Sequence, residues 1–167
     1  MYDELTAVDI QKMQEEMDHR IRDLRPQLIE EVQTARAFGD LSENYEYKCA
    51  KQAKNRNESR IRYLERMIRT AKVIEVDSKA DAVGLFDKVT IFNEMVQQEM
   101  KLEIVTTLRQ DALKGLISKE SPVGKALMGH HVGDRVLVEA GPDMKYYVVI
   151  RAIEKGEDDT SLDISSY

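Results

Sequence analysis

A chain of 167 residues is long enough for one or two small domains, and with 42% hydrophobic and 34% charged residues it has the composition of a globular protein. Its formal net charge of −6 argues against sequence-independent binding to free nucleic acid, which requires a basic surface. No apolar run approaches the roughly 18 residues of a membrane span, and Met1–Glu4 lacks the basic-then-apolar order of a signal peptide, so we expect a cytoplasmic protein without a membrane partner.

The first predicted element is a long helix from about Thr6 to Phe38. Its apolar residues recur at steps of three and four, which indicates the narrow seam of a coiled coil. These residues are Ile10, Met13, Met17, Ile21, Leu24, Leu28, Val32 and Ala35. Pro26 lacks a backbone N–H and crowds the preceding turn, so we expect a kink or a restart near Arg25.

A second long helix is predicted from about Asn44 to Lys72. Its seam residues are small at the start of the helix and larger toward its end: Ala50, Ala53, Asn57, Ile61, Leu64, Ile68 and Ala71. Small residues let two helices approach closely, and the polar Asn57 is expected to fix the register. Cys49, the single cysteine, has no ligand cluster around it and is expected to be a further small seam residue, which excludes a disulfide framework and structural zinc.

The stretch Gly39–Asn44 joins the two helices and is predicted to be the tip of a helical hairpin. Gly39 suits the left-handed position that closes a helix, and Asp40 with Glu43 has the spacing of a capping box for the next helix. The same two carboxylates are candidate ligands for Mg²⁺. Because they supply only part of an octahedral shell, we expect the isolated tip to bind this metal weakly.

The two arms differ in charge. Residues 3–40 contain ten acidic and five basic residues, whereas residues 43–75 contain nine basic and five acidic residues. Several of the basic residues lie within a few turns of the tip. They either form a solvated face that balances the charge of the acidic arm or attract the phosphate groups of a nucleic acid.

Beyond Lys72 the pattern changes to short, β-branched runs that predict an antiparallel sheet. The runs are 73–76, 88–92, 100–105, 135–138 and 146–150. Ser121, Pro122 and Gly129 mark the cap, first turn and end of a short helix between two of them. The predicted fold is therefore α+β, with a coiled-coil hairpin over residues 1–76, a small sheet domain over 77–155, and a polar, acidic, mobile tail without an obvious core face over 156–167.

Two separate motifs carry a resemblance to a known family. The stretch Arg36–Tyr47, which reads RAFGDLSENYEY, resembles the tip signature of the bacterial transcript cleavage factors GreA and GreB. The stretches Ser121–Gly129 and Val132–Asp134 resemble the second motif of the same family. The resemblance extends from Leu5 to about Glu154 and implies that the second domain is FKBP-like.

The resemblance also implies a mechanism. The hairpin would enter the secondary channel of bacterial RNA polymerase, where Asp40 and Glu43 would place a Mg²⁺ ion held jointly with the polymerase, and Ser42 would assist near the RNA. Two-metal hydrolysis would then cleave the 3′ segment of backtracked RNA in the polymerase's own active centre. Basic residues near the tip would contact that RNA, and the second motif would dock on the polymerase. The basic residues are Arg36, Lys48, Lys51, Lys54 and Arg56, and the docking residues are Ser121, Pro122, Val123 and Gly124.

On this reading the protein is an elongation factor that acts as a monomer and activates another enzyme. Three other classes stay open from the sequence. One is a Gre-like regulator that occupies the same channel and inhibits or modulates transcription without stimulating cleavage. The others are a prolyl isomerase, suggested only by the FKBP-like domain, and a coiled-coil adaptor.

Overall fold

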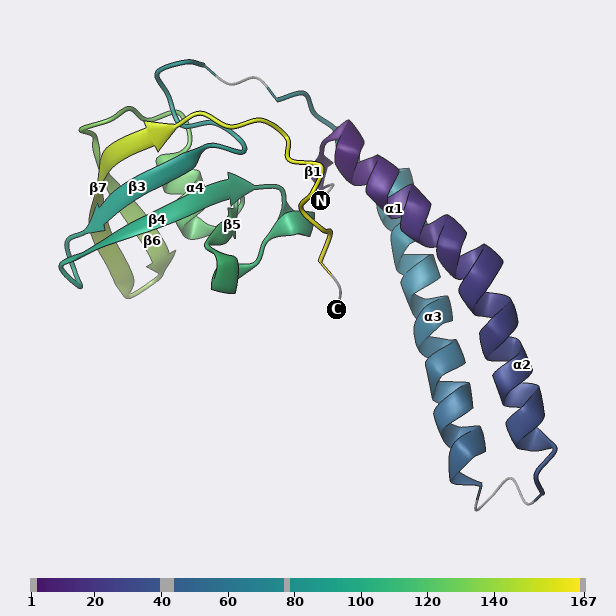
Figure 1. Ribbon diagram of the computed structural model, residues 1–167. Helices are drawn as coiled ribbons and strands as arrows, with labels where there is room; N and C mark the ends of the chain where they lie inside the picture. Colours follow the sequence, from purple (N-terminus) through teal and green to yellow (C-terminus); the bar gives the residue numbers. More distant parts are fainter. Residues whose placement is uncertain (1–2, 40–43, 77–78, 166–167) are drawn as a thin grey trace. The chain divides into compact units, whose positions relative to one another are not determined.

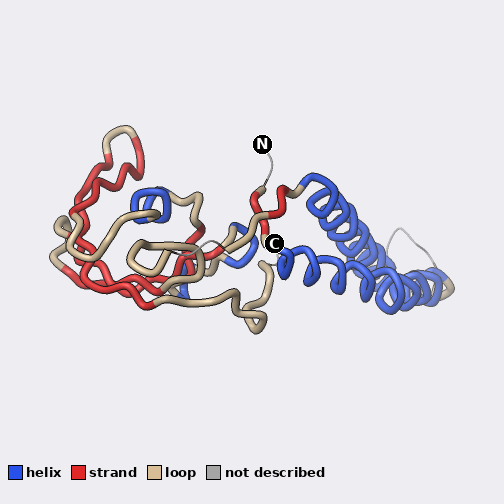
Figure 2. Tube along the Cα trace, turned by 90° about the horizontal axis from the view of Figure 1, so that it is seen from above, coloured by secondary structure: helices blue, strands red, loops and turns tan. Residues whose placement is uncertain are grey.

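The computed structural model describes residues 3–39, 44–76 and 79–165. The chain divides into two compact units, one formed by Ile10–Ala71 and the other by Met1–Asp9 together with Lys72–Tyr167. The first unit is the predicted helical hairpin. Its first arm consists of α1 (Ala7–His19), the π-helix η1 (Arg20–Leu24) and α2 (Arg25–Arg36), and α3 (Tyr45–Thr70) returns beside it (Figures 1 and 2).

The irregular turn in the first arm lies where Pro26 predicts it. Pro26 occupies the first turn of α2, a position that needs no backbone N–H donor. Directly before it, the N–H of Arg25 donates to the carbonyl of Arg20, five residues back, which is the hydrogen bond of a π-helix. The expected interruption near Arg25 is thus confirmed, and it takes the form of a widened turn.

The predicted seam is confirmed except at Cys49, because all of its other residues are buried or half-buried. Asn57 is 4% exposed, and its side chain pairs with Arg20 on the opposite arm. Its Oδ1 accepts from Arg20 Nη1 at 3.0 Å, and its Nδ2 donates to the Arg20 carbonyl at 3.3 Å. A shifted register would separate these groups, as expected for a polar residue in a helix seam.

A salt-bridge network surrounds this pair and was not predicted from the sequence. The Glu16 carboxylate accepts two hydrogen bonds from the buried Arg60 guanidinium, at 2.9 and 3.0 Å, and one from Arg20 Nε at 2.7 Å. Burial raises the pKa of Glu16, but the hydrogen bonds from Arg60 and Arg20 outweigh it and hold that pKa below its ordinary value. We call Glu16, Arg20, Asn57 and Arg60 the polar layer of the hairpin.

The second unit is built on a five-stranded sheet in the order β5-β4-β3-β7-β6. Its strands are β3 (Lys88–Asn93), β4 (Gln98–Val105), β5 (Leu116–Ser118), β6 (Arg135–Gly141) and β7 (Met144–Glu154). All neighbours are antiparallel except β4 and β5. The curled sheet and the short helix α4 (Pro122–Leu127) enclose the apolar core (Figure 1).

The strand predictions at 88–92, 100–105, 135–138 and 146–150 are confirmed. The run at 73–76 was predicted to join the same antiparallel sheet, and this is wrong. The strand there, β2 (Lys72–Val73), pairs in parallel with β1 (Glu4–Leu5) in a separate two-stranded sheet. Strand β5 was not predicted, because its three residues are too few to show a period. Two 3₁₀ turns, Thr107–Arg109 and Ala112–Lys114, precede it.

The short helix α4 is confirmed. Ser121 caps it, with Oγ accepting from the Gly124 N–H at 3.0 Å, and Pro122 stands in its first turn. Gly129, which follows the helix, has a φ of +78°. Gly124 is required by packing, because a Cβ there would lie 2.2 Å from the carbonyl oxygen of Ser118.

The described residues near the two chain ends, 3–9 and 156–165, belong to the same compact unit as the sheet. These two segments meet at Arg109, which is 1% exposed. Its guanidinium donates to Asp9 at 2.6 Å and pairs with Asp158. Leu162 packs against the core, so the segment after residue 155 has the core face that the sequence analysis did not find.

The structure therefore confirms the predicted fold class, an α+β chain in which a two-helix hairpin is joined to a small FKBP-like domain of mainly antiparallel strands. Within residues 3–39, 44–76 and 79–165, no helix is both long enough and apolar enough to cross a lipid bilayer.

Candidate functional site at the hairpin tip

The loop at the end of the hairpin joins α2 to α3. The predicted site residues Asp40, Ser42 and Glu43 lie outside the described part of the chain, so the site is built here from the residues on either side of them. Gly39 has a φ of +124°, so the positive φ implied by the predicted left-handed position is confirmed, although the C-cap of α2 is Ala37, two residues earlier. No atom lies within 4 Å of a Cβ built there, so the backbone angle and not crowding explains this glycine.

Asn44 is the N-cap of α3, and this corrects the predicted capping box of Asp40 and Glu43. Its Oδ1 accepts from the Tyr47 N–H at 3.0 Å. Its Nδ2 donates to the carbonyl of Ala35 in the last turn of α2, at 2.7 Å. One side chain thus satisfies a free N–H at the start of one helix and adds a hydrogen bond to a C=O in the last turn of the other, and it holds the two ends of the loop together.

The described residues nearest the tip also form a basic cluster around an aromatic ring. The Arg36 guanidinium lies 5.7 Å from the centroid of the Tyr47 ring, and Lys51 Nζ lies 6.0 Å from it. Hydrogen bonding to Arg36 lowers the pKa of the Tyr47 hydroxyl, and the charges of Lys51, Arg36 and Lys54 contribute to the same effect. We call Arg36, Tyr47, Lys51 and Lys54 the basic cluster of the tip.

The structure brings together three of the five predicted RNA-binding residues, namely Arg36, Lys51 and Lys54. Lys48 and Arg56 are exposed on α3 but are not among the described contacts of Tyr47. Lys48 instead lines a shallow hollow together with Lys51. Sequence reasoning missed the central position of Tyr47, although the spacing of Tyr47, Lys51 and Lys54 places them on one helix face.

Cys49 was predicted to lie in the seam, and this is wrong because its side chain is exposed. The seam passes through Ala50 and Ala53, which are half-buried. One residue along a helix corresponds to a rotation of about 100°, so an error of one position moves a side chain from the seam to the surface.

The predicted docking residues lie in the second unit, at the start of α4. Ser121 and Gly124 shape the helix as described above, and Val123 packs against the core. Pro122 is exposed. The structure thus assigns a structural contribution to three of the four, and their docking role stays a prediction.

Both units match family models. Residues 4–73 match the model described as "Transcription elongation factor, N-terminal", and residues 77–155 match "Transcription elongation factor, GreA/GreB, C-term". The chain belongs to the GreA/GreB family of transcription elongation factors. Members of this family are transcription elongation factors, which agrees with the prediction from the tip signature.

Individual GreA/GreB relatives agree with this membership. The chain is 43% identical over 136 residues to transcription elongation factor GreA of Thermoanaerobacter pseudethanolicus, covering 81% of this chain and 87% of the relative. It is 37% identical over 154 residues to GreA of Oenococcus oeni, covering 92% and 95%. Among solved structures, GreA factor homolog 1 (Gfh1) of Thermus thermophilus aligns with 93% of this chain and 100% of its own, at 25% identity and a TM-score of 0.43.

Proposed function

We propose that this GreA/GreB family member binds bacterial RNA polymerase, inserts the hairpin tip into the secondary channel and stimulates the polymerase's own Mg²⁺-dependent cleavage of backtracked RNA. The observation that carries the proposal is the position of the α3 cap. Asn44 performs the capping that the sequence analysis had given to the tip acids. A structural explanation for Asp40 and Glu43 is therefore weakened, and a role in binding a partner's metal gains support.

The donor set at the tip fits a shared metal site. In the described part of the chain, no group of three or more His, Cys, Asp or Glu side chains could hold an ion. Asp40 and Glu43 are two carboxylates, which supply only part of the octahedral shell of Mg²⁺, so they would depend on ligands from the polymerase to complete it. When bound in this way, Mg²⁺ would supply activation of water and stabilisation of charge in the transition state.

Charged and polar groups at the tip would position the RNA. The basic cluster offers Arg36, Lys51 and Lys54 on one side of the tip, and an RNA 3′ segment carries the phosphates that such cations attract. Lys48 and Arg56 would add to the positive potential from neighbouring positions on α3. Ser42 would contribute a hydroxyl as a hydrogen-bond donor or acceptor near the RNA.

The second unit would supply affinity for the polymerase through the start of α4. Of the four residues proposed for docking, Ser121, Pro122, Val123 and Gly124, the exposed Pro122 is available for direct contact. The other three keep the helix start in its position.

The experiment that tests the proposal uses stalled, backtracked elongation complexes with Mg²⁺. The wild-type protein is expected to shorten the RNA, and the double variant Asp40→Asn, Glu43→Gln is expected to lose this activity while its affinity for polymerase changes little. The amides keep the size of the acids but remove the charge that a metal requires. Full cleavage by the double variant would contradict the proposed role of the acids. Binding by the wild type without any cleavage would identify the protein instead as a regulator that modulates transcription from the same channel.

A further inference from the structure

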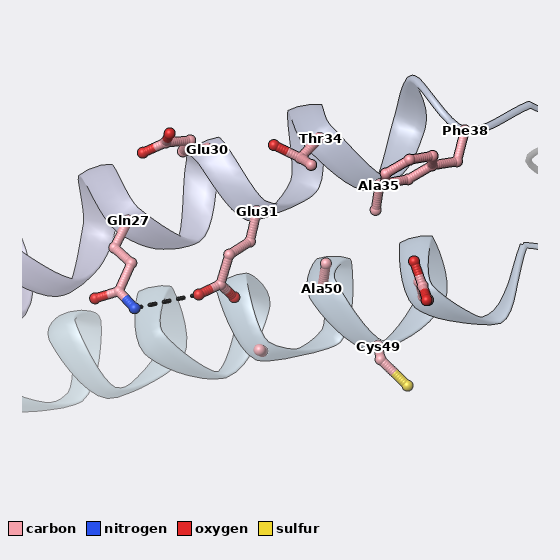
Figure 3. Close-up of a pocket in the computed structure, with 10 residues that line it drawn as sticks. Gln27, Glu30, Glu31, Thr34, Ala35, Phe38, Cys49 and Ala50 are labelled. Carbon is pink, nitrogen blue, oxygen red and sulfur yellow. Dashed lines mark hydrogen bonds between the residues drawn. The ribbon is translucent and has the colours of Figure 1, made fainter.

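A groove of about 590 Å³ runs between α2 and α3 in the half of the hairpin next to the tip (Figure 3). Its volume is in the range of pockets that accept several side chains or a small ligand. The groove exists because the seam residues here, Ala35, Ala50 and Ala53, are small. The sequence analysis expected such residues to let the helices approach closely, but in this region part of the space between the helices stays open.

The groove has an apolar wall at the end nearest the tip. Phe38 lines it, and its side chain lies over Ala35 in Figure 3. Phe38 is 72% exposed, although burying a phenylalanine contributes about 2 kcal/mol. An exposed aromatic residue beside an apolar groove is the composition of a surface that binds another molecule.

The rim of the groove is acidic. Glu30, Glu31 and Glu46 line it, all three are exposed, and the described residues that line it include no Lys or Arg. Glu31 is joined to Gln27 by an exposed hydrogen bond of 3.2 Å, which is also drawn in Figure 3. The rim therefore carries negative charge, in contrast to the basic cluster of Arg36, Lys51 and Lys54 in the same half of the hairpin.

The acidic rim of the groove and the basic cluster of the tip would select different partners. The basic cluster suits phosphate groups, whereas the acidic rim repels them and attracts cations. The apolar residues that line the groove add a requirement for an apolar side chain in the partner. The occupant that satisfies both conditions is a protein segment with an apolar side chain flanked by Lys or Arg.

We propose that the groove binds such a cationic, partly apolar segment of the polymerase while the basic cluster faces the RNA. This inference rests on the proposed function, because it takes RNA polymerase as the partner. In this proposal the small seam residues near the tip also leave room for a side chain of the partner. It also explains why Phe38 is exposed in the free protein.

Photo-crosslinking tests the proposal directly. Cys49 lines the groove, is exposed and is the single cysteine of the chain, so a benzophenone maleimide reacts at one position. The labelled protein is bound to a backtracked elongation complex, irradiated, and the crosslinked product is mapped by mass spectrometry. A label on a Cys49→Ser, Arg62→Cys variant is the control, because Arg62 is exposed on α3 and does not line the groove.

The expected product joins Cys49 to a polymerase peptide that contains Lys or Arg next to an apolar residue, with a yield at least about fivefold above the control. A crosslink to RNA would overturn the proposal, as would a crosslink to a second copy of this chain. A crosslinking yield no higher than that of the control variant would also overturn the proposal.

Two variants measure the contribution of the groove. Glu30→Lys with Glu31→Lys reverses the charge of exposed residues and is expected to weaken polymerase binding about tenfold. Ala50→Leu fills the groove and is expected to weaken binding by a similar factor. If Ala50→Leu separates the helices, which circular dichroism would detect, the charge-reversal variant still tests whether the groove contributes to polymerase binding. Glu65→Lys, exposed on α3 outside the groove, is the matched control, and equal effects of Glu65→Lys and the charge reversal would contradict the inference.

Cleavage measured in the same reactions separates the two proposals. If the expected crosslink forms but the RNA is not shortened, the proposed cleavage function fails and the groove assignment stands. If the RNA is shortened but the crosslink falls on RNA, on a second copy or on neither, the proposed function stands and the groove assignment fails.

Discussion

The two halves of the hairpin are built from the same pair of helices but differ in what their side chains do. In the base half, Met13, Ile61, Leu64 and Met67 are buried, and the polar layer joins the arms. In the tip half, the small seam residues leave a groove, and Phe38 and Tyr45 are 72% and 77% exposed.

The base half therefore holds the two helices together, and the tip half presents a surface. Large buried side chains contribute roughly 1.5–3 kcal/mol each, whereas a seam of alanines contributes much less. The base half can therefore keep the register for the whole hairpin. The tip half is then free to expose aromatic and charged groups to a partner.

The sharpest test of this comparison is Glu16→Ala. It removes the carboxylate that accepts two hydrogen bonds from the buried Arg60, and we expect a loss of about 2–3 kcal/mol of hairpin stability. Thermal unfolding followed at the helical signal of the full chain measures it. Glu15→Ala is the control and should cost less than about 0.5 kcal/mol, because Glu15 accepts an exposed hydrogen bond from Gln11. Equal effects of the two variants would show that the polar layer does not hold the base half.

Acid should weaken the same layer. The pKa of Glu16 is below its ordinary value in the folded protein, so its contribution is complete above that ordinary value, about 4.3, and is lost as the pH falls through the folded pKa. The difference in Tm between the wild type and Glu16→Ala should therefore shrink between neutral pH and pH values below the ordinary pKa. A constant difference across this range would contradict the assignment. Glu58, whose pKa is lowered by its hydrogen bond with Arg25, is expected to behave in the same direction.

A smaller effect on stability is expected at the tip. Asn44→Ala removes the cap of α3 and the link to the carbonyl of Ala35, which should cost about 1 kcal/mol. Hydrogen exchange should show faster opening of the first turn of α3, with little change near Leu64. Asn55→Ala, an exposed position on the same helix, is the control. Uniform acceleration along the whole of α3 would indicate that the two halves are not separable.

The smallest effect on stability, less than about 0.5 kcal/mol, is expected for Lys51→Ala, because Lys51 is exposed. Its effect should appear in the RNA-cleavage assay, where we expect a reduction of about two- to fivefold that grows with salt concentration. Lys12→Ala, far along the chain from the tip, serves as the control. Equal cleavage by both variants at every salt concentration would remove the basic cluster from the proposed RNA contact.

Local rules were enough to predict much of this protein. The period of the apolar residues gave both arms of the hairpin, because a buried stripe on a helix must repeat every three to four residues. Pro26 gave the position of the irregular turn, and Ser121 with Pro122 gave the start of α4, because each acts on its own backbone neighbourhood. The tip signature and the second motif gave the family.

Features that join residues distant in the sequence could not be predicted in this way, because they depend on how the chain folds in three dimensions. The polar layer requires that Glu16 meet Arg60 across the hairpin, 44 residues away, and the burial of Arg109 requires Asp9 and Asp158 from opposite ends of the chain. The pairing of β1 with β2 has the same origin. Each of these contacts depends on which side chains face one another after folding, and a pattern read along one segment does not contain that information.

The same reason explains the errors at the tip. Asp40 with Glu43 and Asn44 with Tyr47 both have a spacing that can cap a helix. In the structure α3 begins at Tyr45 with Asn44 as its N-cap, and the Asn44 side chain also reaches the carbonyl of Ala35 in α2. Cys49 and Ala50 differ by one position, and the rotation of α3 against α2 turned Ala50 to the seam and Cys49 to the surface. The groove between the arms also follows from this packing, since it is space that two helices leave open and no residue encodes it alone.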